Sequence, residues 1–139
     1  MNKILTLCAL VAGFLSTGSV FAQTNKGINM MENKKILVAY YSYSGNTKEV
    51  AEEIHQKIGG DIFEIKTNDT YPDEYRPMTV QAKKEIQDGY RPKLVTKIDD
   101  ISQYDIIFLG SPTWWGTITP QVSSFIETYD MSGKKSFRL

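Results

Sequence analysis

The sequence contains one cysteine, Cys8, and one histidine, His55, among 139 residues. A single cysteine cannot form a disulfide within the chain. Together, one cysteine and one histidine are too few for the thiolate and imidazole clusters that hold metals in proteins. His55 falls on the polar side of a predicted helix, as surface histidines usually do. We therefore expect no metal site.

Neither sign of charge is in excess, because 16 Lys and Arg residues balance 16 Asp and Glu residues. The lack of a basic surplus argues against a nucleic-acid partner, and the lack of an acidic surplus argues against a charged tail. Hydrophobic residues make up 41% of the chain and charged residues 23%, which is typical of one globular domain.

The chain also lacks a hydrophobic run suited to a stable membrane span. Residues 4–20 are mostly apolar, but Gly, Ser and Thr interrupt them, and the run is short for a transmembrane helix. Lys3 precedes the run, and Val20, Phe21 and Ala22 form a small-residue cleavage site before Gln23. We predict a signal peptide at residues 1–22, a flexible lead-in at residues 23–33 and export, to the periplasm. The alternative is a buried N-terminal helix.

The most informative stretch present is an apolar run, residues 36–40, that ends in small polar residues and continues into an amphipathic helix. Its loop reads Ser42, Tyr43, Ser44, Gly45, Asn46 and Thr47. Hydroxyls, free backbone N–H groups and the positive end of the helix dipole converge there, which predicts an anion site, most often for phosphate. The loop has no lysine, so it is not a nucleotide P-loop. A plain helix cap after a turn is the alternative.

Strand and helix patterns alternate along the rest of the chain. We predict strands near residues 35–41, 61–66 and 104–110, helices near 47–58, 78–88 and 119–129, and the start of another strand at 133–135. We expect the helix at 78–88 to lie on the sheet through Met78, Ala82 and Ile86. This order is that of a doubly wound parallel α/β sheet, which binds ligands at the carboxyl ends of its strands.

A second unusual loop follows the strand at 104–110, and it reads Ser111, Pro112, Thr113, Trp114, Trp115 and Gly116. It should face the same crevice as the first loop. Together, in this order and spacing, the two loops resemble the FMN phosphate loop and the flavin-ring loop of the flavodoxin family. The resemblance covers residues 34–135 and implies a three-layer α/β/α fold with FMN as cofactor.

The resemblance implies that Ser42, Tyr43 (through its backbone), Ser44, Gly45, Asn46 and Thr47 bind the FMN phosphate. It implies that Pro112, Thr113, Trp114, Trp115 and Gly116 line the isoalloxazine ring, with one indole stacked on it. Alternatively, one tryptophan belongs to the core and the other is exposed. No catalytic side chain is identified, because the redox chemistry belongs to the cofactor.

The flavodoxin pattern has five strands, whereas this sequence stops within the fourth. We therefore expect residues 34–139 to be a C-terminally truncated flavodoxin-like domain, without the third cofactor loop and with an exposed sheet edge through which it could self-associate. The leading functional prediction is FMN-dependent electron transfer to a redox partner protein or small-molecule acceptor. The alternatives are an NAD(P)H-dependent FMN or quinone oxidoreductase and a flavin-free remnant or interaction module.

Overall fold

The computed structural model describes residues 33–133 and 135–138, with side chains up to residue 133. The predicted signal peptide, and the lead-in apart from Asn33, lie outside the described residues. The elements are β1 (Ile36–Tyr40), α2 (Asn46–Ile58), β2 (Asp61–Glu64), α3 (Tyr75–Gln87), the 3-10 helix η1 (Ile101–Gln103), β3 (Ile106–Gly110), α4 (Pro120–Thr128) and β4 (Lys135–Arg138).

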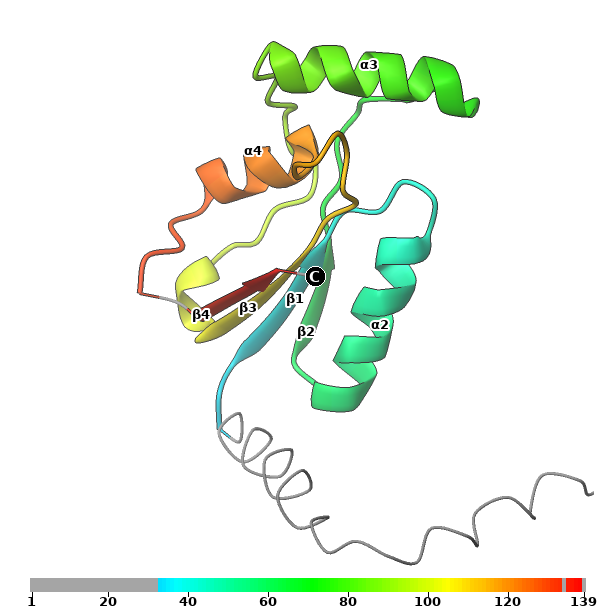
Figure 1. The fold of residues 1–139 in the computed structure, drawn as a ribbon. Helices are drawn as coiled ribbons and strands as arrows, with labels where there is room; N and C mark the ends of the chain where they lie inside the picture. The colour runs from blue at the N-terminus through cyan, green and yellow to red at the C-terminus, as the bar shows by residue number, and fades with distance from the viewer. Residues whose placement is uncertain (1–32, 134, 139) are drawn as a thin grey trace, which may run out of the picture. The chain divides into compact units, whose positions relative to one another are not determined.

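The described strands form a parallel sheet in the order β2-β1-β3-β4 (Figure 1). This confirms the predicted doubly wound arrangement, including a fourth strand that begins at Lys135. All five residues of β1 are buried, because the strand has a neighbour on each side and a helix on each face. Its continuous apolar run is what such a central strand requires.

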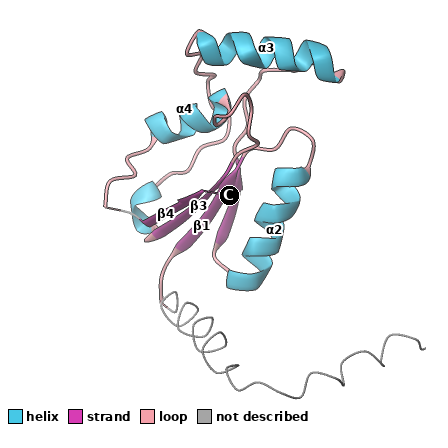
Figure 2. Ribbon diagram, viewed as in Figure 1, coloured by secondary structure: helices cyan, strands magenta, loops and turns pink. Residues whose placement is uncertain are grey.

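Helices cover both faces of this sheet, as Figure 2 shows. On one face Val122 and Phe125 of α4 pack against Leu37, Ala39 and Ile107. On the other face Ala51 of α2 packs against alternate residues of β1, namely Val38 and Tyr40. Within the described residues, no helix is long and apolar enough to cross a membrane.

The ends and placement of α3 differ from the prediction. The helix begins at Tyr75 instead of Met78, because Pro77 falls in its first turn, where a missing N–H is tolerated. Its buried residues Met78 and Ala82 pack against Trp114, so α3 lies beyond the carboxyl ends of the strands and not on the sheet (Figure 1). This places a helix over the crevice where both predicted loops meet.

His55 also differs from the prediction, since it is half-buried and not fully exposed. Its Nδ1 atom is buried without a hydrogen-bond partner in the part of the chain that the structure describes.

The prediction that the chain has no His or Cys metal centre was made for the whole sequence, of which the structure describes only a part. Among the described residues, no group of three or more His, Cys, Asp or Glu side chains could hold a metal ion.

Candidate functional site

The two predicted loops leave the carboxyl ends of adjacent strands, β1 and β3. The backbone N–H of Tyr41 donates to the Gly110 carbonyl at 3.0 Å, which holds the starts of the loops together. Gly110 has no side chain, and a Cβ there would lie 2.8 Å from Tyr40 Cβ and 3.1 Å from Thr47 Cγ2. Glycine therefore permits the close approach of β3 to the first loop.

The first loop presents the N-terminus of α2 without a side-chain cap. Gly45, the residue before the helix, has φ +96°, a left-handed conformation that favours glycine. Ser42 Oγ accepts a hydrogen bond from the Gly45 N–H at 3.1 Å, which shapes the turn. The first-turn N–H groups of α2 have no partner within the helix. Ser44 and Asn46 are exposed beside them, as an anion site requires.

The second loop is closed at its base by Ser111. Its hydroxyl oxygen accepts from the Thr119 N–H at 3.1 Å, and its hydroxyl donates to the Pro112 carbonyl at 2.9 Å. The tip is a tight turn in which Trp114 and Thr117 exchange two backbone hydrogen bonds of 3.0 Å. These bonds fix the positions of Trp114 and Trp115.

Trp115 has φ +50° and Gly116 has φ +79°, the pattern of a type I′ turn, in which Asn-Gly is the usual pair. A tryptophan in this conformation is strained. Two contacts with α3 hold its indole: Nε1–H donates to the Thr79 carbonyl at 3.0 Å, and Lys83 Nζ lies 4.6 Å from the ring centroid.

The two tryptophans lie in different environments. Trp114 is only 8% exposed and packs edge-on against Tyr41, Tyr43 and Tyr71, with ring centroids 6.1, 5.9 and 5.0 Å away. Trp115 is 57% exposed. This difference agrees with the alternative given in the sequence analysis, in which one tryptophan belongs to the core and the other is exposed. Both nevertheless line the same pocket.

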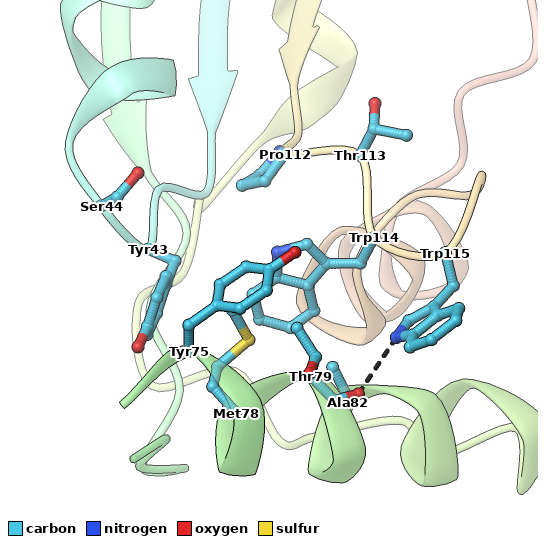
Figure 3. A pocket seen from close by; sticks show the side chains of 10 residues that line it. All are labelled: Tyr43, Ser44, Tyr75, Met78, Thr79, Ala82, Pro112, Thr113, Trp114 and Trp115. Carbon is cyan, nitrogen blue, oxygen red and sulfur yellow. Dashed lines mark hydrogen bonds between the residues drawn. The ribbon is translucent and has the colours of Figure 1, made fainter. Parts of the chain in front are cut away.

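That pocket, of about 570 Å³, brings parts of both loops together with α3 (Figure 3). Of the predicted site residues it is lined by Tyr43, Ser44, Pro112, Thr113, Trp114 and Trp115. The remaining predicted residues lie in the same two loops but do not line it, and they are Ser42, Gly45, Asn46, Thr47 and Gly116. The pocket is thus continuous with the first loop through Ser44, beside the start of α2.

Comparison with known proteins agrees with this geometry, since the flavodoxin family model matches residues 35–138. The chain belongs to the flavodoxin family. A solved structure of a Lactobacillus acidophilus flavoprotein in complex with FMN is 31% identical, with a TM-score of 0.62, and the match covers 76% of this chain and 74% of that one. A protein from Bacteroides eggerthii assigned as a flavoprotein is 32% identical, with a TM-score of 0.68, and the match covers 76% and 69%.

Curated relatives of this flavodoxin-family chain include an NAD(P)H dehydrogenase (quinone) from Archaeoglobus fulgidus. It is 28% identical over 106 residues, which is 72% of this chain and 52% of the relative. A second protein of that name, from Azorhizobium caulinodans, is 32% identical over 107 residues, 75% of this chain and 49% of the relative. The chain therefore spans about half the length of the curated relatives it matches.

Sequence reasoning missed one wall of the site in this flavodoxin-family chain. Tyr75, Met78, Thr79 and Ala82 of α3 also line the pocket. Their spacing of three, four and seven residues places them on one face of the helix, a signal that was available in the sequence. It pointed to a buried face but not to the surface that buries it.

A hydrogen-bonded network joins α3, α4 and the segment between β2 and α3. The Tyr71 hydroxyl donates to Glu85 Oε2 at 2.5 Å and accepts from Gln121 Nε2 at 2.7 Å. Gln81 Nε2 donates to Glu85 Oε1 at 2.8 Å.

Burial and the Glu85 carboxylate raise the pKa of Tyr71. Burial, with Glu85 and Asp69, raises the pKa of Tyr41 to about 12. Both phenols stay protonated at neutral pH and do not act as bases, and the Tyr71 hydroxyl joins α3 to α4 beside Trp114.

Proposed function

We propose that this chain binds FMN and transfers electrons. The observation that carries the proposal is a pocket, at the carboxyl ends of β1 and β3, that is lined by the aromatic second loop and by Ser44, which lies beside the uncapped N-terminus of α2. A helix N-terminus suits a phosphate, and an uncharged aromatic surface suits a flat conjugated ring. Membership of the flavodoxin family and the solved FMN complex of a relative support this proposal.

The residues of the first loop fit the phosphate of FMN. Its hydroxyls and the Asn46 amide can donate hydrogen bonds, and the open space at the Cβ position of Gly45 leaves room for the group to approach the backbone. The predicted phosphate ligands are Ser42, Tyr43 (backbone), Ser44, Gly45, Asn46 and Thr47.

The second loop fits the ring, and the predicted ring contacts are Pro112, Thr113, Trp114, Trp115 and Gly116. Bound FMN supplies one- and two-electron redox chemistry. The chain binds and orients the ring and keeps water from part of it. We propose a redox partner protein or a small-molecule electron acceptor as the second reactant.

A second candidate function is that of an NAD(P)H-dependent quinone oxidoreductase. The names of the curated relatives favour it, and no charged side chain lines the described pocket, which suits a quinone ring.

The test of these two functions combines two assays on the purified chain. Quenching of FMN fluorescence on titration supports the flavoprotein, and FMN-dependent oxidation of NAD(P)H with a quinone supports the enzyme. No response in either assay contradicts both and favours a flavin-free interaction module.

We also propose that the chain is exported to the periplasm after cleavage before Gln23. Mass spectrometry of the chain from its host should find Gln23 as the N-terminal residue, and a chain that retains Met1 contradicts export by this route.

We further propose that the chain self-associates. Two exposed apolar side chains support this proposal: Val50 on α2 and Ile62 on the edge strand β2. Sedimentation should then depend on concentration, and a constant value over a hundredfold range would overturn it.

A further inference from the structure

Tyr75 is a large aromatic side chain that lines the pocket without a partner of its own. It is 76% exposed. Within the described residues its hydroxyl makes no hydrogen bond and its ring makes no aromatic contact. The aromatic face of Tyr75 is therefore available to a ligand in the pocket.

The aromatic residues of the second loop, in contrast, are held firmly in place. Three tyrosine rings and the side chains of Met78 and Ala82 surround Trp114. Trp115 is fixed to α3 by the hydrogen bond to Thr79 and the contact with Lys83. The pocket therefore has a packed wall formed by these indoles and an exposed aromatic side chain, Tyr75, in its lining (Figure 3).

The position of Tyr75 is set by a helix and not by a flexible loop. It shares one face of α3 with Met78 and Ala82, which anchor the helix against Trp114. In Figure 3 its ring projects from α3 into the same space that Pro112 and Ser44 border. Val80, on the same helix, is 70% exposed but does not line the pocket.

The chemistry of the lining defines what Tyr75 meets. The ten lining residues, all described, are uncharged. Three of them are Ser or Thr, and the other seven are aromatic, Met, Ala or Pro: Tyr43, Tyr75, Met78, Ala82, Pro112, Trp114 and Trp115. A flat, uncharged, conjugated ring is the ligand part that suits such a surface.

We propose that Tyr75, at the start of α3, forms a second aromatic surface of the ring site and stacks on the isoalloxazine of FMN. This inference rests on the proposed function, because it assigns a side chain to the ring of the cofactor proposed there. It gives α3 a role in binding that the family's two loops do not account for.

The test compares Tyr75→Ala, Tyr75→Phe and the matched control Val80→Ala by titration with FMN and with riboflavin, which lacks the phosphate. Tyr75→Ala should raise the Kd of both ligands by about tenfold, equivalent to about 1.4 kcal/mol. Tyr75→Phe keeps the ring and should stay within about twofold of the wild type. Val80→Ala should leave both Kd values unchanged. Circular dichroism melts of all three variants should coincide with the wild type, because both side chains are exposed.

An unchanged FMN affinity in Tyr75→Ala, with normal binding by the wild type, would overturn this inference and leave the proposed function intact. A loss of FMN affinity without a matching loss for riboflavin would also overturn it, because the effect would then act through the phosphate. A wild-type chain that binds no FMN would overturn the proposed function and this inference with it.

Discussion

Gly110 is the residue on which the spacing of the two loops depends most directly. A Cβ at this position would meet Tyr40 Cβ at 2.8 Å and Thr47 Cγ2 at 3.1 Å. Neither atom is the far end of a flexible side chain, so relief requires a shift of β1 or of the first loop. The residue thus connects the packing of β3 to the geometry of the phosphate site.

The variant Gly110→Ala should therefore lose both stability and affinity. Overpacking of this kind costs about 1–3 kcal/mol of unfolding free energy, and displacement of Thr47 should weaken FMN binding as well. Urea unfolding and FMN titration measure the two effects. A variant with wild-type values in both would show that the loops are not held by this contact.

The half-buried Tyr41 predicts an alkaline limit to stability. Burial, with Glu85 and Asp69, raises the pKa of Tyr41 to about 12, against about 10 in an unfolded chain. The folded state thus favours the neutral phenol. Its stabilisation is complete below about pH 10 and is lost as the pH rises from there through about 12.

The Tyr41 phenol should therefore cause no change in the melting temperature between about pH 7 and 9, and it should lower the melting temperature above about pH 10. Tyr41→Phe should fall less steeply, because it removes one of the phenols whose ionisation opposes folding. Scanning calorimetry over this range measures the slopes. Equal slopes for the variant and the wild type would contradict the assignment to Tyr41.

At the scale of elements, Tyr71 connects α3 to α4. Its hydroxyl joins Glu85 of α3 to Gln121 of α4, and Gln121 is fully buried. Removing the hydroxyl leaves the Gln121 amide without this acceptor in a site that water reaches poorly. The cost of an unsatisfied buried group is larger than that of a lost surface hydrogen bond.

Tyr71→Phe should therefore lower the free energy of unfolding by about 1–3 kcal/mol. Tyr90→Phe is the matched control, since the exposed Tyr90 hydroxyl also donates to a carboxylate, that of Asp69, at 2.5 Å. It should cost less than about 0.5 kcal/mol. Guanidinium unfolding measures both variants, and equal losses would argue against a connecting role for Tyr71.

Local signals explain which elements could be predicted from the sequence. Thr119 is a residue type that caps helices and Pro120 suits a first turn, and in the structure Thr119 does accept from the Val122 N–H. Gly59 and Gly60 are typical of a helix end, and α2 ends just before them. The placement of α3 was not, because its apolar face is buried by Trp114, more than thirty residues later in the chain. No local pattern specifies such a partner.

At the scale of the whole molecule, the strand order β2-β1-β3-β4 brings together two loops that are about 70 residues apart in sequence. Both loops could be identified from their residue types, and the parallel sheet predicts that they share one edge. The wall that α3 adds, and the different exposure of Trp114 and Trp115, depend on tertiary packing. They could be found only in the structure.

The central claim, that the α2 N-terminus binds the phosphate of FMN, is tested most directly by placing a negative charge there. Asn46→Asp preserves shape at the first position of α2, while Gln56→Glu adds the same charge at an exposed position in the last turn of that helix. Titration with FMN and with riboflavin compares the two. The account predicts that Asn46→Asp raises the FMN Kd at least tenfold and leaves riboflavin unchanged, since two like charges would face each other. Gln56→Glu should change neither value. Equal FMN affinity in Asn46→Asp and the wild type would contradict the account.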